Sequence, residues 1–160
     1  MLVLVMGVSG CGKTTLGRAL AERLGARFLD GDDFHPEANV RKMAAGTPLD
    51  DADRRPWLAR LNAELRACEA HGESAVLACS ALKAVYRATL GNGLQRLDTV
   101  FLDADPAVIR ERLAGRSHRY MPASLLQSQL DTLEPPANAI RVDVAQSPDS
   151  CLAQALEALG

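Results

Sequence analysis

Gly7-Val8-Ser9-Gly10-Cys11-Gly12-Lys13-Thr14 fits the pattern G-x-x-x-x-G-K-[ST] at every fixed position. An apolar run at residues 2–6 precedes this stretch, and a helix-like run at residues 13–24 follows it and ends at Gly25. Strand, glycine loop and helix in this order form the context in which the pattern binds phosphate groups. The stretch therefore predicts a phosphate-binding loop in an α/β fold.

The residue types of the loop explain how it would hold a polyphosphate. Glycines let the backbone turn its N–H groups inward, and the start of the following helix adds positive dipole. We expect Lys13 to reach the outer phosphates and Thr14 to place its hydroxyl on a bridging Mg²⁺ ion. The predicted nucleotide-binding residues are Gly7, Val8, Ser9, Gly10, Cys11, Gly12, Lys13, Thr14 and Thr15.

Length and composition indicate one globular domain, residues 1–160, with 48% hydrophobic and 24% charged residues. The formal charge of −2 argues against a surface that coats nucleic acid. The first apolar run is too short to span a bilayer, and no charged segment with an apolar core opens the chain, so we expect a cytoplasmic protein without a membrane partner.

The four cysteines lie far apart, without a C-x-x-C pair or histidines at ligand spacing, which predicts reduced thiols. Cys79 sits in an apolar run and is expected in the core, whereas Cys11 in the glycine loop is expected to be exposed enough to react.

Further short apolar runs predict strands at residues 26–30, 74–80, 99–103 and 140–144, with helical stretches between them. Strands that alternate with helices imply crossover connections, and these predict a three-layer α/β/α fold with a five-stranded, mostly parallel sheet. Asp105 before Pro106 predicts a helix cap. A buried helix stripe is expected at Leu58, Leu61 and Leu65, and a loop at residues 31–36.

Two segments, about 36–72 and about 116–136, are longer than a crossover needs. By analogy with nucleotide-dependent kinases, they would hold an acceptor-binding site and a closing lid. The second contains Arg116 and Arg119, and an arginine there could neutralise charge on a transferred phosphoryl group.

Asp30 and Asp32 follow the second strand and, if the chain stays extended, point to the same side at the edge where ligands bind in such sheets. Asp30 could hold Mg²⁺, directly or through water, and Asp32 could accept the proton of a substrate hydroxyl. A solvated acidic turn is the alternative. The third strand ends in Cys79-Ser80 without a carboxylate, so the ligand of the metal must come from elsewhere.

Ser80, Lys83, Tyr86 and Arg87 combine hydroxyls with cations, which suits a small, anionic, polyhydroxylated substrate. A solvated helix face is the competing interpretation. His35 could contact the substrate or only hydrogen-bond locally, and Arg54 could reach the substrate or only pair with Asp50 or Asp51. Trp57 is interpreted as a packing residue.

Several stretches, which together cover nearly the whole chain, resemble those of the gluconokinase family. The members of this family are phosphate-loop, shikimate-kinase-like small-molecule kinases. The stretches are Met6-Gly7-Val8-Ser9-Gly10-Cys11-Gly12-Lys13-Thr14-Thr15, Phe28-Leu29-Asp30-Gly31-Asp32-Asp33-Phe34-His35-Pro36 with Asn39 and Lys42-Met43, Gly46-Thr47-Pro48-Leu49-Asp50-Asp51-Ala52-Asp53-Arg54, Pro56-Trp57-Leu58, Cys79-Ser80-Ala81-Leu82-Lys83 with Tyr86-Arg87, and Leu125-Leu126-Gln127-Ser128-Gln129 running into Leu133-Glu134-Pro135-Pro136.

The resemblance implies a fold like that of the nucleoside monophosphate kinases and transfer of the γ-phosphoryl group of ATP to D-gluconate, with Mg²⁺ as cofactor and a homodimer as assembly. It implies catalytic roles for Lys13, Asp32 and Arg116, and adds Lys42 to the substrate-binding residues. Where relatives commonly have Gly-His-Phe-Met-Pro, this chain has His118-Arg119-Tyr120-Met121-Pro122, so Arg119 adds either a lid cation or an exposed charge.

Two other functions compete with this interpretation. A phosphate-loop kinase of another small acid, such as shikimate, or of adenylylsulfate would use the same scaffold. A nucleotide-dependent regulatory module is the alternative outside the enzymes, but the sequence contains no N-K-x-D or D-x-x-G motif of a GTP switch.

Overall fold

Five parallel strands form a single sheet in the order β2-β3-β1-β4-β5, so the strand that leads into the glycine loop lies at its centre. The computed structural model describes residues 1–114 and 123–160. The strands are β1 (Leu2–Met6), β2 (Arg27–Asp30), β3 (Ala75–Ala78), β4 (Asp98–Asp103) and β5 (Ile140–Asp143). This arrangement confirms the predicted parallel α/β sheet.

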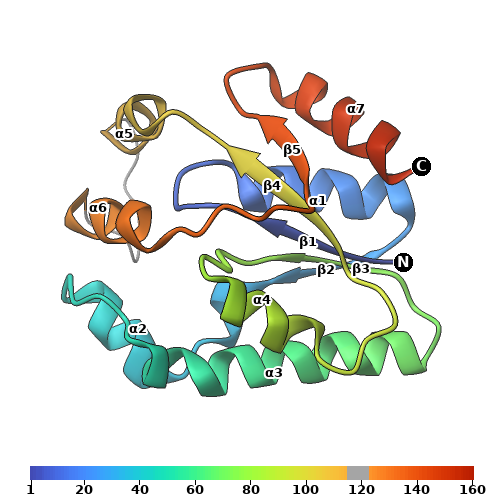
Figure 1. The fold of residues 1–160 in the computed structure, drawn as a ribbon, viewed down its shortest axis with the longest axis horizontal. Helices are drawn as coiled ribbons and strands as arrows, with labels where there is room; N and C mark the ends of the chain where they lie inside the picture. The colour runs from blue at the N-terminus through green and yellow to red at the C-terminus, as the bar shows by residue number, and fades with distance from the viewer. Residues whose placement is uncertain (115–122) are drawn as a thin grey trace.

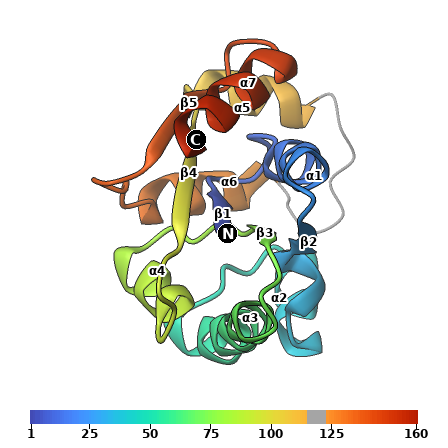
Figure 2. The same cartoon turned by 90° about the vertical axis from the view of Figure 1, so that its right-hand side faces the viewer.

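Helices cover both faces of the sheet, as Figures 1 and 2 show. The helices α1 (Lys13–Leu24) and α7 (Pro148–Leu159) lie on one face, and α3 (Asp51–Ala70) and α4 (Ala84–Gly91) lie on the other. The remaining helices are α2 (Glu37–Ala44), α5 (Pro106–Ala114), α6 (Ala123–Thr132) and the 3₁₀ helix η1 (Gly31–Phe34). Both α5 and α6 lie toward the carboxyl ends of the strands (Figure 1).

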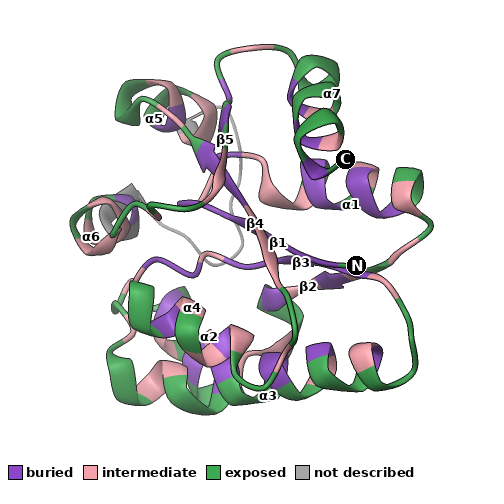
Figure 3. Ribbon diagram, turned by 45° about the vertical axis from the view of Figure 1, so that its right-hand side comes forward, coloured by how far each residue is buried: buried purple, intermediate pink, exposed green. Residues whose placement is uncertain are grey.

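Alternation along β1 divides the core into two layers. Leu2, Leu4 and Met6 pack with Leu61 and Leu65 of α3, whereas the intervening valines pack with α1 and α7. Figure 3 shows the resulting buried sheet between helices whose outer faces are exposed. Because both faces of the sheet are covered, the inner strands β1 and β3 are buried along their whole length, whereas the edge strands β2 and β5 include exposed residues. The predicted helix stripe at residues 58, 61 and 65 is confirmed, since all three leucines are at most 3% exposed.

Most element boundaries agree with the sequence-based expectation to within two residues, and β1 and α1 agree at both ends. The predicted cap at the start of α5 is confirmed, because the Ala107 amide donates to Asp105 Oδ1 at 2.8 Å. The expected loop at residues 31–36 is wrong in part, since residues 31–34 form η1. The Asp30 carboxylate accepts a hydrogen bond from the Asp32 amide and thereby tightens this turn.

The four cysteines are all unpaired and buried. Cys79 lies in the core as expected, but the expectation that Cys11 is exposed is wrong, because its side chain faces the apolar layer around α1 and is 2% exposed. Burial raises the pKa of the Cys11 thiol, which keeps it protonated and unreactive. No helix in the part of the chain described is long and apolar enough to cross a bilayer.

Candidate active site

A cavity opens at the carboxyl end of the sheet, and we refer to it as the sheet-edge cavity. About 700 Å³ of space between its lining residues is free of protein atoms, and this volume includes open solvent. The glycine loop, the segments after β2 and β3, the α2–α3 connection, α3 and α6 contribute its lining residues: Ser9, Lys13, Asp32, His35, Met43, Thr47, Pro48, Leu49, Arg54, Trp57, Ser80, Leu82, Ser128 and Gln129. Parallel strands bring their carboxyl ends to one edge, so residues far apart in the sequence meet here.

The glycine loop leaves the start of α1 open to an anion. Gly12 has a φ of +97°, a left-handed conformation that favours glycine, and no side chain of the described residues caps the helix. The first turn of α1 also contains no acidic residue. Lys13 Nζ donates to the Val8 carbonyl oxygen at 3.1 Å, so its charge stays at the loop. Bare N–H groups, the helix dipole and this cation suit phosphate oxygens.

Thr14 and Asp30, the predicted metal ligands, face one another beside Lys13. Thr14 Oγ1 donates to Asp30 Oδ2 at 3.5 Å, and burial raises the pKa of the Asp30 carboxyl. Two hard oxygen donors next to a phosphate site fit Mg²⁺, which keeps several waters and takes few protein ligands. Among residues 1–114 and 123–160, no group of three His, Cys, Asp or Glu side chains could hold a metal ion. Phosphate oxygens and water would therefore complete the shell.

Asp32 and Asp30 have different surroundings. The extended conformation assumed for this segment is wrong, because Asp32 belongs to η1 and lines the sheet-edge cavity while Asp30 faces Thr14. The turn depends on Gly31, since a Cβ there would lie 2.8 Å from the Ala78 carbonyl oxygen. Asp32 is exposed and stands in the cavity with Lys13. One carboxylate is thus available to a metal and the other to a ligand in the cavity.

His35 lines the cavity and is fixed by packing and hydrogen bonding. Its ring stacks on Trp57, with centroids 4.0 Å apart and planes 18° apart. Trp57 is 2% exposed and donates from Nε1 to the Gly31 carbonyl oxygen at 2.7 Å, so its expected packing role is confirmed. Burial first, and the Arg54 charge second, lower the pKa of His35 to about 4. His35 is therefore neutral at pH 7.

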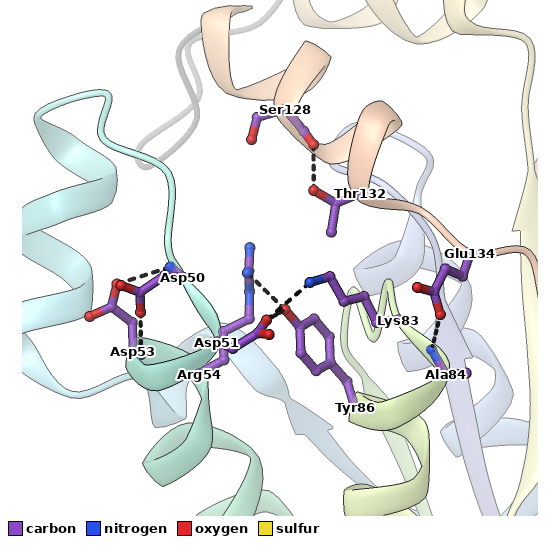
Figure 4. Close-up of polar contacts among 10 residues, drawn as sticks. All are labelled: Asp50, Asp51, Asp53, Arg54, Lys83, Ala84, Tyr86, Ser128, Thr132 and Glu134. Atoms are coloured by element: carbon purple, nitrogen blue, oxygen red, sulfur yellow. Dashed lines mark hydrogen bonds and ion pairs between the residues drawn. The ribbon is translucent and has the colours of Figure 1, made fainter.

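Arg54, Tyr86, Lys83 and Asp51 form a polar cluster (Figure 4), and of these four residues Arg54 lines the sheet-edge cavity. Tyr86 donates its hydroxyl hydrogen to Asp51 Oδ1 and accepts from Arg54 Nη1 at 3.0 Å. Lys83 Nζ lies 3.1 Å from the same Asp51 oxygen. The Tyr86 hydrogen bond and, after it, Lys83 lower the pKa of Asp51. The Lys83 charge is thereby compensated within the protein.

Of the three cations Lys42, Lys83 and Arg54, only Arg54 both lines the sheet-edge cavity and lacks a carboxylate partner among the described residues. Lys42 pairs with Asp53 at 2.8 Å and is not among the cavity-lining residues, and Lys83 pairs with Asp51. Arg54 lines the cavity and forms no ion pair with a carboxylate within the described ranges. The alternative in which Arg54 only pairs with Asp50 or Asp51 is not supported, because the described residues form no such direct ion pair. The guanidinium of Arg54 can therefore take an anionic ligand.

Arg87, a predicted substrate-binding residue, does not line the sheet-edge cavity. Its guanidinium donates to the Ala81 carbonyl oxygen at 2.7 Å and to the Glu134 carbonyl oxygen at 2.8 Å. Ala81 has a φ of +45°, a strained value for a residue with a side chain. Arg87 thus stabilises the turn after β3 that carries Ser80 into the cavity.

Sequence reasoning assigned no role to Gln129, which lines the cavity from α6. Gln129 Oε1 accepts a hydrogen bond from the Ser9 amide at 2.7 Å and so connects α6 to the glycine loop. Glu134, just beyond α6, accepts from the Ala84 amide at 2.9 Å and joins the same segment to α4. The stretch that contains both residues was noticed only as part of a resemblance. The helix α6 has six polar residues among ten, so its sequence does not single out Gln129.

A second cavity lies on the other side of the glycine loop. Its lining includes Gly10, Gly12 and Thr15 from the loop and α1, and Val144, Gln146 and Pro148 near β5. Arg112 also lines it and donates to the Val144 carbonyl oxygen at 2.8 Å. The glycine loop thus contributes Ser9 and Lys13 to the sheet-edge cavity and Gly10, Cys11 and Gly12 to the second cavity. Arg116, the predicted lid catalyst, and Arg119 lie outside the described residues.

Comparisons with known proteins connect this geometry to one family. The family model described as "AAA domain" matches residues 2–136. The chain is 48% identical to a gluconokinase of Gluconobacter oxydans (strain 621H) over 153 residues, which cover 94% of this chain and 86% of that protein. It superimposes on a gluconokinase structure from Sinorhizobium meliloti 1021 with a TM-score of 0.89 and 44% identity, covering 99% of this chain and 90% of that one.

The fold is shared more widely than the family. An APS kinase of Mycobacterium tuberculosis, solved with AMPPNP and APS, matches with a TM-score of 0.70 and 21% identity over 99% of this chain and 96% of that one. At that identity the likeness concerns the fold alone, and it confirms the expected phosphate-loop kinase architecture.

Proposed function

The chain belongs to the gluconokinase family of phosphate-loop kinases, and from this premise we propose that it transfers the γ-phosphoryl group of ATP to D-gluconate. The products are 6-phospho-D-gluconate and ADP, so the enzyme is a phosphotransferase with an alcohol group as acceptor. The observation that carries the proposal is the sheet-edge cavity, which joins Lys13 of the glycine loop to Asp32 and to Arg54. A phosphate site, a carboxylate and a cation without a carboxylate partner are what a sugar-acid kinase requires.

Arg54 would bind the carboxylate of gluconate. An arginine can hold a carboxylate with two parallel hydrogen bonds, and such charge-assisted bonds are the strong ones. Tyr86 receives one N–H of Arg54 and fixes the guanidinium, while Asp51 and Lys83 hold Tyr86 in turn. Ser80 and His35 would contact hydroxyl groups along the chain of the acceptor, since both line the cavity. Lys42 and Arg87 would support the site without touching the acceptor.

ATP would lie across the glycine loop. The second cavity, next to β5, would take the adenine, and the bare N–H groups at the start of α1 would take the phosphates. Thr14 and Asp30 would hold Mg²⁺, the latter directly or through water, and the ion would neutralise oxygens of the β- and γ-phosphates. Lys13 would leave the Val8 carbonyl to bind the same oxygens.

Asp32 would orient the acceptor hydroxyl and accept its proton. The hydroxyl oxygen attacks the γ-phosphorus, its proton passes to the Asp32 carboxylate, and the bond from the γ-phosphorus to the bridging oxygen of ADP breaks. Lys13 stabilises negative charge on the transferred group. Arg116 is proposed to contribute a further positive charge on closure of the lid segment.

A coupled ADP-release assay with a panel of acceptors tests the proposal. The panel contains D-gluconate, other sugar acids, shikimate and adenylylsulfate, each with ATP and Mg²⁺. We expect gluconate to give by far the highest kcat/KM. A higher value with shikimate or adenylylsulfate would assign the chain to another small-acid kinase activity. Nucleotide binding without transfer to any acceptor would instead favour the regulatory module.

The family resemblance also predicts a homodimer, which sedimentation equilibrium would test. We place the enzyme in the cytoplasm, where ATP is available and thiols stay reduced, and the four unpaired cysteines are consistent with this location.

A further inference from the structure

Asn39 is a buried polar residue of α2 to which the proposed reaction gives no role. Its side chain is 3% exposed and does not line the sheet-edge cavity. Asn39 Nδ2 donates to the Asp53 carbonyl oxygen at 2.9 Å and lies 3.3 Å from His35 Nδ1. Because a carbonyl oxygen only accepts hydrogen bonds, the atom facing Asp53 must be the NH₂ group of the amide. Both of its hydrogens therefore have an assigned direction, one toward Asp53 and one toward His35.

This arrangement determines the protonation of the His35 ring. A donor faces Nδ1, so Nδ1 must accept and the ring hydrogen must sit on Nε2. A proton on Nδ1 would point at the NH₂ group of Asn39 and leave both groups unsatisfied. The ring is also held in its plane by the stack on Trp57 at 4.0 Å. Asn39 thus selects one tautomer, and Trp57 selects one orientation.

The N–H group at Nε2 of His35 is available to donate a hydrogen bond to a ligand. Within residues 1–114 and 123–160, no protein atom accepts a hydrogen bond from His35 Nε2. The described structure also contains no buried side-chain nitrogen or oxygen without a partner, so solvent must reach this atom. His35 lines the sheet-edge cavity, which makes that solvent the water that an acceptor would displace.

We propose that Asn39 is a positioning residue that fixes His35 as a neutral Nε2–H donor to a hydroxyl oxygen of the acceptor. The inference rests on the proposed function for the identity of the acceptor, but the tautomer itself follows from the hydrogen bonds alone. Arg54 supplies the charged contact to the acceptor, and His35 supplies a neutral one. A neutral donor suits a hydroxyl group, because it adds no charge beside Arg54 in the cavity.

The surroundings of the ring keep it neutral over the working pH range. Burial and Arg54 lower the pKa of His35 to about 4. The charged groups that face the same cavity are Lys13 from the start of α1, Asp32 from η1 and Arg54 from α3, and Asn39 on α2 is uncharged. The Nε2–H donor of the neutral ring is therefore present at pH 7 and at any pH well above 4.

The tautomer can be read directly by ¹⁵N NMR of histidine-labelled protein, with His35→Gln used to assign the signals. We expect a pyridine-like Nδ1 and a pyrrole-like Nε2 for His35 at pH 7. In Asn39→Asp, a carboxylate oxygen faces Nδ1 and should move the proton there or give the charged ring. A wild-type spectrum with Nδ1 protonated, or an unchanged His35 pattern in Asn39→Asp, overturns the proposal.

Asn62→Asp is the matched control for Asn39→Asp. Asn62 is also a buried asparagine, 8% exposed, and donates to the Leu90 and Asn92 carbonyl oxygens away from the cavity. We expect this variant to lose stability while the His35 signals stay unchanged. A shift of the His35 signals in both variants would mean that general destabilisation, and not the Asn39 contact, sets the tautomer.

Substitutions of His35 itself test whether the acceptor needs a hydrogen-bond donor at the position of Nε2. They leave the buried Asn39 unchanged. The amide nitrogen of glutamine can reach the position of Nε2, whereas that of asparagine reaches only the position of Nδ1. We expect His35→Gln to keep the KM for gluconate within about threefold and His35→Asn to raise it about tenfold, the value of one hydrogen bond. The KM for ATP should stay the same in both. Equal KM values for gluconate in the two variants would remove the donor role.

Failure of this inference and failure of the proposed function give different results. If no acceptor is phosphorylated but His35 shows the Nε2–H pattern that Asn39→Asp reverses, the proposed function fails and the positioning role stands. If gluconate is phosphorylated but the pattern is reversed or absent, the enzyme is a gluconokinase and Asn39 does not position His35.

Discussion

The helices α1 and α3 both begin at the sheet-edge cavity, and they begin in opposite ways. At α1 the cap is Gly12, no side chain in the described part of the chain caps the helix, and the first turn contains no acidic residue. At α3 the Asp50 carboxylate accepts from the Asp53 amide and the Asp53 carboxylate accepts from the Asp50 amide, which is a complete capping box. One helix start is left open and the other is closed.

The difference indicates that the start of α1 is available to bind a ligand, whereas the start of α3 stabilises the fold. The first N–H groups of any helix lack partners within the helix. At α3 the protein satisfies two backbone N–H groups itself through Asp50 and Asp53. Asp53 also pairs with Lys42, and Asp51 of the first turn pairs with Lys83. At α1 the corresponding groups are left for a phosphate ligand. Substitutions at the open start should therefore change catalysis, and substitutions at the closed start should change stability.

Lys13→Ala should produce the largest effect on the open side. The variant lacks a preorganised donor to the transferred phosphoryl group, which is worth about 3–4 kcal/mol, or several hundredfold in kcat. Steady-state kinetics with gluconate and ATP measure the loss, and Arg18→Ala on the exposed side of α1 is the control. Near-wild-type kcat in Lys13→Ala would refute the placement of ATP at the glycine loop.

Asp32→Asn should lower kcat by about a hundredfold, since a general base contributes at least that much. The KM for gluconate should change little, because the amide keeps the size and most hydrogen bonds of the carboxylate. Comparison of the change in kcat with the change in KM distinguishes proton transfer by Asp32 from binding of the acceptor by Asp32. A change confined to KM would mean that Asp32 binds the acceptor without receiving its proton.

The fold and the open site were largely predictable from the sequence. Strands buried on both faces appear as continuous apolar runs, so residues 2–6 and 74–80 marked strands whatever packed on them. The glycine loop is local in sequence, and its position between a strand and a helix followed directly. Local patterns are therefore sufficient to predict the glycine loop and its place in the fold without knowledge of tertiary contacts.

The acceptor side was predictable only in outline, because its charges are decided by tertiary contacts. Lys42, Lys83 and Arg54 looked equivalent in the sequence. The capping box at α3 brings Asp53 to Lys42, and the first turn brings Asp51 to Lys83, which leaves Arg54. The turn at Asp32 was missed because it depends on a hydrogen bond to the Asp30 side chain. Such pairings have no periodic signal.

Arg54→Ala should raise the KM for gluconate about thirtyfold, or about 2 kcal/mol, because a charge-assisted bond to the carboxylate is lost. Lys42→Ala is the matched control, since it also removes one cation near α3, but one that Asp53 already compensates. Its KM for gluconate should stay within about twofold. An equal rise in the two variants would show that long-range charge, and not the cavity contact, sets acceptor affinity.

Acid should weaken the fold through His35. Its pKa is about 4 in the folded protein against an ordinary value of 6.5, so the unfolded chain binds more protons between these limits. The free energy of unfolding therefore falls as the pH falls through this range. Between pH 7 and pH 5 we expect wild type to lose about 1–2 kcal/mol more than His35→Gln, allowing for partial exposure of the ring. Urea unfolding at the two pH values measures this, and equal losses would contradict the buried neutral ring.

Substitution of Asp50, the cap of α3, should have the smallest effect of these variants. In contrast to Lys13→Ala, it should lower stability and leave kcat unchanged. Asp50→Ala removes the cap and should cost about 1 kcal/mol, or about 2–4 °C in Tm, while kcat stays near wild type. Asp50→Ser restores an oxygen that can accept from the Asp53 amide and should recover most of the lost stability. Thermal unfolding of the three proteins gives the comparison. If Asp50→Ala instead lowers kcat by tenfold or more at unchanged Tm, α3 does not merely support the site, and the division between an open and a closed helix start is wrong.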